Sequence, residues 1–234
     1  MAEINRREVI SLSIKSFLGI SAFLPILQSC SNLSANNVKD LDWRSFVNQI
    51  QDMAPEYGKE GFDEEAYLSK LISMSHKLNI NDKDIQKHFV NYQNRNTKFP
   101  EFTKMHQEKS FQITLLEFEA GEKIPLHNHP DMSGVILCVK GNIAIDNFDL
   151  LPKKSENERL LLKQTDSVIM KPGMVGSLSS TRGNIHSLKA TKFTRLIDIF
   201  TPPYDKRRIK DSRYFSKSAQ SYKGAKGIFE AKYM

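Results

Sequence analysis

Two histidines separated by a single residue, His127 and His129, have the type and spacing expected of metal ligands. In an extended strand, side chains two positions apart lie on the same face, so both imidazoles could bind one metal ion. A third histidine, His186, would share a strand face with Leu188 and Ala190, and this apolar company predicts that it points into a barrel. We therefore interpret His127, His129 and His186 as a candidate metal site.

Glycines on either side of the histidine pair complete a longer motif. Gly121, five residues, His-x-His and then Gly141 resemble the first motif of the cupin superfamily, which implies a double-stranded β-helix with the metal inside the barrel. Most metal-binding cupins carry a glutamate ligand four or five residues after the second histidine, whereas this chain has Ser133 and Gly134 there. The candidate ligand set is therefore three neutral histidines without a carboxylate.

Such a ligand set favours particular chemistry. Three histidines on one face of an octahedral ion leave the opposite face open for substrate and O₂. Because neutral ligands leave the charge of a divalent ion uncompensated, an anionic donor such as a thiolate can bind it directly, and the ion favours deprotonation of a coordinating thiol. Zinc also accepts three histidines and a water molecule, so the ligands alone do not identify the metal.

A longer match extends the resemblance and favours iron. Residues 124–132 (IPLHNHPDM), 183–186 (GNIH) and 198–204 (DIFTPPY) resemble, in this order, segments of the cysteamine dioxygenase and plant cysteine oxidase family. The three motifs together span roughly residues 110–215, about half of the chain. A lone His-x-His would be weak support, whereas all three motifs in the right order are fairly specific.

The resemblance implies a reaction. Fe(II) would be held by the three histidines, and both atoms of O₂ would be inserted into a thiol to give a sulfinic acid. The substrate would be a small aminothiol or a peptide that begins with cysteine. The resemblance also implies catalytic roles for Asp198, which would orient an imidazole or meet the substrate amine, and for Tyr204, whose hydroxyl could reach the pocket.

Other functions stay open on the sequence alone. The main alternative is an exported metal-binding cupin without oxygenase activity, acting as a sensor or binding module. Nucleic-acid binding rests only on the net charge of +7, and no recognisable spacing of aromatic residues supports it, so we expect no nucleic-acid partner. Ser212 stands where some family members carry a cysteine, which excludes a thioether crosslink built from that position.

The elements that must position these residues fall into two regions. Residues from about 40 to 95 have apolar residues at helical spacing behind candidate caps, namely Asp40 or Asp42, then Asp63, then Asp82. From about residue 99, alternating apolar residues and Gly or Pro turns predict many short strands, with a charged hairpin loop at 153–163. The predicted fold is mainly β, a cupin double-stranded β-helix (jelly-roll barrel) preceded by a short α-helical region.

Three segments follow from these patterns. Residues 1–30 read as a signal peptide or membrane anchor, residues 31–98 as a linker and helical region packing on the barrel, and residues 99–234 as the cupin thiol dioxygenase domain with a basic C-terminal extension. The surplus charge belongs to that extension, because the residues after position 205 include nine basic and only two acidic ones. The extension could contact a membrane surface, but a solvated extension is the simpler expectation.

The N-terminal residues predict an export signal. Arg6 and Arg7, followed by a short apolar run, resemble a twin-arginine export signal. The sequence Leu-Gln-Ser-Cys ending at Cys30 resembles a lipobox in which that cysteine is lipidated, although glutamine is unusual inside that motif. We expect a protein of the bacterial cell envelope, periplasmic or lipid-anchored, with possible membrane attachment through the N-terminus. The alternative is a cytoplasmic protein whose apolar N-terminal helix packs on the domain.

The remaining cysteine and histidines are expected to be structural. Cys138 lies in an apolar stretch and should pack as a small hydrophobic side chain. His76 and His88 lie on predicted helices near apolar faces, and His106 lies in a polar stretch before the first expected strand, at the surface. With 39% hydrophobic residues and two cysteines, the chain is neither disordered nor a disulfide scaffold, and we expect a monomer.

Overall fold

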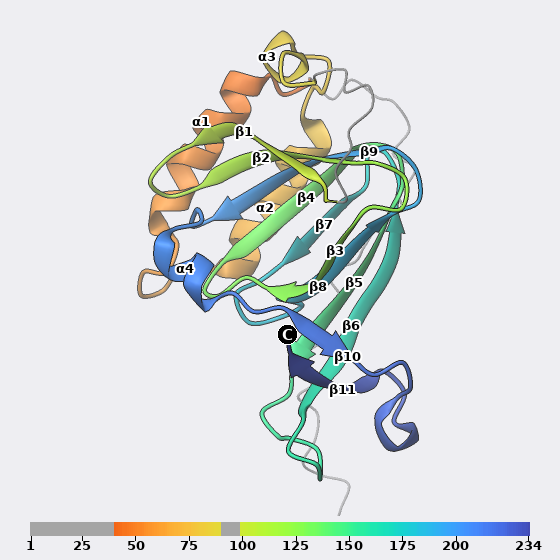
Figure 1. Cartoon of the computed structure of the whole chain (residues 1–234). Coiled ribbons are helices and arrows are strands. Elements are labelled where there is room, and N and C mark those ends of the chain that lie inside the picture. Colours follow the sequence, from red (N-terminus) through yellow and green to blue (C-terminus); the bar gives the residue numbers. More distant parts are fainter. Residues whose placement is uncertain (1–39, 90–98) are drawn as a thin grey trace, which may run out of the picture. The chain divides into compact units, whose positions relative to one another are not determined.

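The structure, a computed structural model, describes residues 40–89 and 99–234 (Figure 1). The predicted signal or anchor at 1–30, with Arg6, Arg7 and Cys30, lies outside the described residues, as do residues 90–98. Among the residues described, no helix combines the length and the apolar character needed to cross a membrane. The segment boundaries at residues 30 and 98 therefore stay predictions.

The helices precede the strands in the chain. They are α1 (Trp43–Met53), the short 3-10 helix η1 (Ala54–Glu56), α2 (Glu64–Lys77) and α3 (Lys83–Gln86). Asp42, Asp63 and Asp82 cap α1, α2 and α3, each accepting a hydrogen bond from a backbone N–H of the following turn. These caps confirm the predicted helix starts, because an aspartate at this position satisfies an N–H group that the helix itself leaves unpaired.

The strands form two antiparallel sheets. In chain order they are β1 (Glu101–Gln107), β2 (Gln112–Phe118), β3 (Lys123–Asn128), β4 (Ser133–Lys140), β5 (Ile143–Leu150), β6 (Leu160–Met170), β7 (Val175–Leu178), β8 (Ile185–Ala190), β9 (Thr194–Thr201), β10 (Phe215–Lys217) and β11 (Ile228–Tyr233). One sheet has the order β1-β2-β9-β4-β7 and the other the order β10-β11-β6-β5-β8-β3. This architecture confirms the predicted double-stranded β-helix.

The central strands of the first sheet, β2, β9 and β4, are mostly buried on both faces. Alternating residues such as Leu115 and Ile197 point outward and form one hydrophobic core with Phe46 of α1 and Leu71 of α2. Helix α2 lies against β4 and β7 (Figure 1). Because side chains alternate along a strand, the residues between these, such as Asp198, point into the space between the sheets.

A second hydrophobic core is formed by residues of both sheets. Cys138 is buried there among Leu116, Phe118 and Leu196, as expected for a small hydrophobic side chain, and burial raises the pKa of its thiol to about 11. Gly141 turns the chain after β4 with φ of 87°, and an added Cβ would lie 2.2 Å from the carbonyl oxygen of Phe193. Only glycine fits this turn, which explains the motif glycine.

Three local predictions were wrong. The expected loop at 153–163 is shorter, because β6 begins at Leu160 and its first residues pair with β11 near the C-terminus. His106 lies within β1 rather than before the first strand. Helix α3 ends at Gln86, so His88, which was expected on a helix, lies in the turn that follows it. The pairing of β6 with β11 also makes the basic C-terminal extension part of the second sheet.

Candidate metal centre

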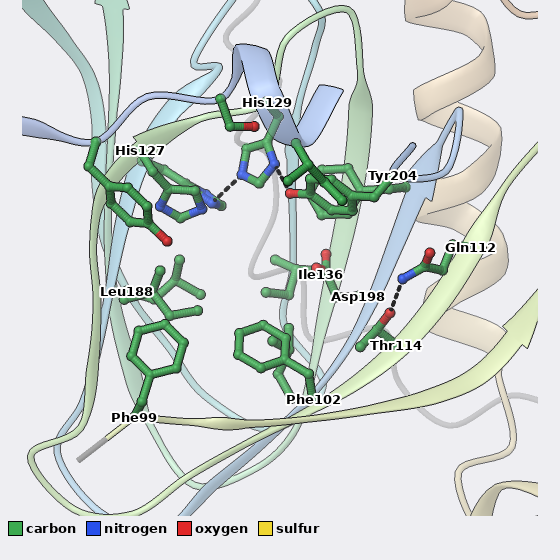
Figure 2. A pocket seen from close by; sticks show the side chains of 17 residues that line it. Phe99, Phe102, Gln112, Thr114, His127, His129, Ile136, Leu188, Asp198 and Tyr204 are labelled. Carbon is green, nitrogen blue, oxygen red and sulfur yellow. Dashed lines mark hydrogen bonds between the residues drawn. The ribbon is translucent and has the colours of Figure 1, made fainter. Parts of the chain in front are cut away.

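The three predicted histidines come together at one end of the space between the sheets. His127 on β3 and His186 on β8 are directly opposite each other in the strand register, and His129 follows the end of β3. Their ligand nitrogens all lie within 4.8 Å of one another. The Nε2 atoms of His129 and His186 are 2.9 Å apart. Figure 2 shows His127 and His129 with their rings turned toward the same point in the cavity.

The local backbone aims the first imidazole. Strand β3 is the edge strand of its sheet. The nitrogen of Pro125 has no hydrogen to donate, and an edge strand tolerates this because one of its sides has no neighbouring strand. The register shifts between Ile124 and His127, a bulge that changes where the following side chain points. The His127 Nδ1 donates to the Pro125 carbonyl at 2.8 Å, and the Nε2 lone pair is then available to a metal.

Burial keeps the three imidazoles in the ligand form. His129 is 2% exposed, and burial lowers the pKa of His129 and of His186 well below the ordinary value, with help from the charge of neighbouring imidazoles. Burial also lowers the pKa of His127. Neutral imidazole is the form that binds metals, so the cluster fits a divalent transition-metal ion, and within the described residues it contains no carboxylate.

The two residues in place of the usual glutamate have their own contacts. A Cβ on Gly134 would lie 2.7 Å from the Phe200 ring, and that ring stacks on the His129 imidazole with centroids 4.5 Å apart. The glycine therefore leaves room for the ring that supports His129. The Ser133 hydroxyl is buried and donates to the Glu64 carboxylate, at the start of α2.

Asn184 holds the backbone of one candidate ligand. Its side-chain oxygen accepts a hydrogen bond from the His129 N–H at 2.9 Å. Its amide nitrogen donates to the carbonyls of Ser179 at 2.9 Å and Met132 at 3.2 Å. The side chain thus joins the loop before β8 to the turn that follows β3, two segments that are 50 residues or more apart in sequence.

The same loop is also tied to the helical region. Glu64, the first residue of α2, accepts hydrogen bonds from the Ser180 N–H at 2.7 Å and the Ser180 hydroxyl at 3.1 Å. The Tyr57 hydroxyl lies 2.9 Å from the Ser133 hydroxyl in this network. Asp149 of β5 accepts from the N–H of Gly183 at 2.5 Å on the opposite side. The loop that carries Asn184 is therefore held from both sides.

The predicted catalytic residues lie beside the histidines. The Tyr204 hydroxyl makes a short hydrogen bond with Nδ1 of His129. If Nε2 of that ring binds a metal, Nδ1 carries the proton and donates a hydrogen bond to the tyrosine oxygen. Burial, with added effects of Asp198 and Tyr214, raises the pKa of Tyr204 well above its ordinary value, so the phenol stays protonated at neutral pH.

Asp198 is the acidic side chain of the cavity wall. It lies on β9 opposite Thr114 of β2, and both line the cavity (Figure 2). Burial raises the pKa of the Asp198 carboxyl to about 8, because an apolar surrounding disfavours the charged form. Without a cationic partner, this carboxyl is therefore mostly neutral at pH 7.

The cavity is large and mostly apolar. Its volume is about 350 Å³, and polar groups of Gln112, Thr114 and Ser212 join the histidines, Asp198 and Tyr204 in lining it. Tyr214 also lines it, and this residue pairs with His127 through an isolated β-bridge. Asn128 accepts a hydrogen bond from the Arg213 N–H at 2.6 Å, which fastens this segment beside β3. Ser212 thus faces the cavity.

Sequence reasoning missed Asn184, Glu64 and Tyr214. Asn184 belongs to a motif segment that matched the family, so its position two residues before His186 was a usable signal. Glu64 appeared only as part of an acidic helix start, and nothing in the sequence around it predicts the contact with Ser180, which is 116 residues away.

The remaining histidines lie apart from the described metal cluster, including His76 on α2 and His106 on β1.

Two facing antiparallel sheets with three converging histidines define a metal-binding cupin. The sequence identifies the family, since residues 68–232 match the PCO_ADO family model. Human 2-aminoethanethiol dioxygenase is 27% identical over 180 residues, which cover 66% of this chain and 66% of that protein. Plant cysteine oxidase 1 of Arabidopsis thaliana is 28% identical over 115 residues, 47% of this chain and 39% of that protein.

The chain belongs to the PCO_ADO family. The family resemblance predicted from the three motifs is therefore confirmed. The chain matches part of the length of each relative, at 66% of the human protein and 39% of the plant protein. A solved cupin superfamily protein from Desulfitobacterium hafniense has a TM-score of 0.36 and 17% identity, over 48% of this chain and 84% of that one.

Proposed function

We propose that this protein is a non-haem iron thiol dioxygenase that converts an aminothiol, or the thiol of an N-terminal cysteine, to its sulfinic acid. The observation that carries the proposal is the ligand set of three converging histidines, of which His129 and His186 are buried, without a carboxylate in the described cluster. When bound there, Fe(II) supplies a redox-active centre that brings a thiolate and O₂ together. The reaction balances as thiol plus O₂ giving sulfinic acid, and the electrons that reduce O₂ come from the thiol sulfur.

The side chains of the site would hold the ion and determine its surroundings. The ion would be held through the Nε2 atoms of His127, His129 and His186. Tyr204 would accept a hydrogen bond from the Nδ1–H group of His129, which fixes the orientation of that ring. Because these ligands are neutral, the charge of a divalent ion is left for the thiolate to balance. The apolar wall around the histidines limits water at the site, which strengthens such charge interactions.

Asp198 is suited to the substrate amine. A protonated amine beside this carboxyl would lower its pKa from about 8 and form an ion pair in an apolar surrounding. The carboxylate and the ammonium group are stable in this apolar surrounding only as a pair, because burying either charge alone costs free energy. The pair would orient an aminothiol so that its sulfur points toward the three histidines.

Activity should be tested on anaerobically iron-loaded protein. Cysteamine and a cysteine-initiated peptide are each supplied with O₂, and the product is examined by mass spectrometry for a gain of two oxygen atoms. We expect turnover in the wild type and in His76→Ala, whose histidine is exposed on α2, and none in His127→Ala. Absence of product from every thiol in a sample with measured full iron content would refute the proposal.

We also propose that the protein is exported to the bacterial cell envelope, on the basis of Arg6 and Arg7 ahead of a short apolar run. Replacing both arginines by lysine should leave the protein in the cytoplasmic fraction. Cys30→Ser should remove any lipid and release the protein from membranes. Unchanged export of the double lysine variant would contradict the twin-arginine route.

A further inference from the structure

A stacked pair of half-exposed aromatic rings forms the end of the cavity farthest from the histidines. Phe99 is 45% exposed and Phe102 50% exposed, and their ring centroids are 5.9 Å apart at an interplanar angle of 26°. Both residues line the same cavity as the three histidines. Figure 2 shows them across the cavity from His127 and His129, with Leu188 and Ile136 between.

The charges of the cavity wall restrict what can fill it. None of the described residues that line the cavity is a lysine or arginine, and Asp198 is their one acidic residue. The α-carboxylate of a free amino acid would find no cationic side chain here, and burying it costs free energy unless the metal ion compensates it at the expense of the thiolate. A substrate whose first residue carries an amine and whose carboxyl is already an amide avoids this cost.

The volume of the cavity points to more than a minimal aminothiol. A cavity of about 350 Å³ would hold on the order of twelve water molecules at liquid density, and cysteamine fills only a fraction of such a space. Cavities of this size with mainly apolar walls typically hold larger ligands that extend along the wall. The unfilled part would lie next to the two phenylalanines.

The strand register sets the distance from the amine position to the aromatic pair. Asp198 on β9 faces Thr114 on β2, and Leu116, two residues along β2, faces Phe102 on β1. Phe102 therefore lies two strands across the sheet and two residues along it from Asp198. At about 4.8 Å per strand and about 3.4 Å per residue, the two backbones are roughly 12 Å apart. Two extended peptide residues span about 7 Å, and side chains on both partners bridge the rest.

We propose that Phe99 and Phe102 form a subsite for an apolar side chain on the residue that follows the N-terminal cysteine of a peptide substrate. This inference rests on the proposed dioxygenase activity and adds a preference within it. The amine meets Asp198, the sulfur points toward the histidines, and the second side chain covers the exposed rings. Removing aromatic and aliphatic surface from water supplies the preference, and ring-on-ring contact adds to it.

The preference is measured with C-terminally amidated Cys-Gly, Cys-Leu and Cys-Phe peptides, together with cysteamine. Amidation removes the peptide carboxylate as a variable. In the wild type we expect kcat/KM for Cys-Phe to exceed that for Cys-Gly by about tenfold. Phe102→Ala should remove most of this ratio while leaving kcat/KM for cysteamine nearly unchanged. Ile169→Ala is the matched control, because Ile169 is 57% exposed on β6 and lies outside the described cavity wall.

Equal kcat/KM for the glycine and phenylalanine peptides in the wild type would overturn the proposal. So would an equal loss for cysteamine and Cys-Phe in both Phe102→Ala and Phe99→Ala. A second readout separates this inference from the dioxygenase activity. Amidated Ser-Phe and Ser-Gly, which lack the reactive sulfur, are titrated into metal-free protein by calorimetry. Tighter binding of Ser-Phe that disappears in Phe102→Ala supports the subsite even if no thiol is oxidised, and equal binding refutes it.

Discussion

The asparagine that bridges two distant segments of the site, Asn184, can be tested by shortening its side chain to alanine. Asn184→Ala removes the acceptor of the His129 N–H and the donor to two carbonyls, those of Ser179 and Met132. The methylene group stays, so packing changes little. Two consequences are expected, one for folding stability and one for metal binding.

The loss of stability follows from the three hydrogen bonds. Each contributes about 0.5–1.5 kcal/mol net to folding, giving about 1.5–4.5 kcal/mol in total. Asn184 is half-buried, and water can replace part of what is lost, so we expect about 2 kcal/mol. For a chain of this size, that lowers Tm by about 4–8 °C.

The effect on metal binding is separate. The Asn184 side chain positions the His129 backbone and so acts through that ligand. Removing a group that orients a metal ligand commonly weakens metal binding by about 10–100-fold. Thermal unfolding of the metal-free protein measures the first effect. Titration with Co(II), followed by its visible spectrum at a temperature where all variants are folded, measures the second.

Two further variants make this test selective. Asn184→Asp keeps an acceptor for the His129 N–H but loses the donor to the two carbonyls, so it should lose stability while retaining more metal affinity than Asn184→Ala. Asn157→Ala changes an exposed asparagine in the loop before β6 and should alter neither quantity. Wild-type Co(II) affinity in folded Asn184→Ala would refute the reasoning.

Three more predictions concern groups around the cluster. Tyr204→Phe removes the acceptor of the His129 Nδ1 proton, and we expect about 10-fold weaker Co(II) binding with unchanged α-helix content by circular dichroism. In metal-free protein, the Asp198 pKa is raised from 3.8 to about 8, so the stability that its neutral form contributes is complete below pH 3.8 and is lost as the pH rises toward 8. Asp198→Asn stays neutral, and its free energy of unfolding relative to wild type, measured by urea unfolding, should therefore increase between pH 5 and 8; a flat difference would contradict the raised pKa. Glu64→Gln weakens the charge-assisted bonds to Ser180, and we expect about 1–2 kcal/mol lower stability by the same assay, whereas exposed Glu65→Gln should have no effect.

Much of the site could be predicted from local patterns. The spacing of two residues predicted that His127 and His129 share a metal site, and the two do converge although His129 lies beyond the end of β3. Alternation along a strand placed Asp198 with Leu196 and Phe200 on the inner face of β9. The family resemblance added Tyr204 and was confirmed by the match over residues 68–232. Helix starts were predictable because a capping aspartate acts within its own first turn.

Other features depended on residues that are distant in sequence. The predicted loop at 153–163 is shorter in the structure, because residues 160–163 belong to β6 and pair with β11, about 65–71 positions away in sequence. His106 was placed at the surface before the strands, yet it lies in β1 and stacks on Phe111. The local sequence does not show which strands will pair, since the backbone hydrogen bonds of a strand are all made to its neighbours.

The sequence by itself determined the strand and helix periods, the turn glycines, the helix caps and the candidate metal ligands, because each depends on the geometry of a few neighbouring residues. The tertiary structure alone decided that His186 lies opposite His127, that Asn184 holds the His129 backbone, and that the aromatic pair shares their cavity. These arrangements depend on strand register and on loop contacts across 50 residues or more. Their stability comes from burial and hydrogen bonding of the whole fold, which no short segment possesses.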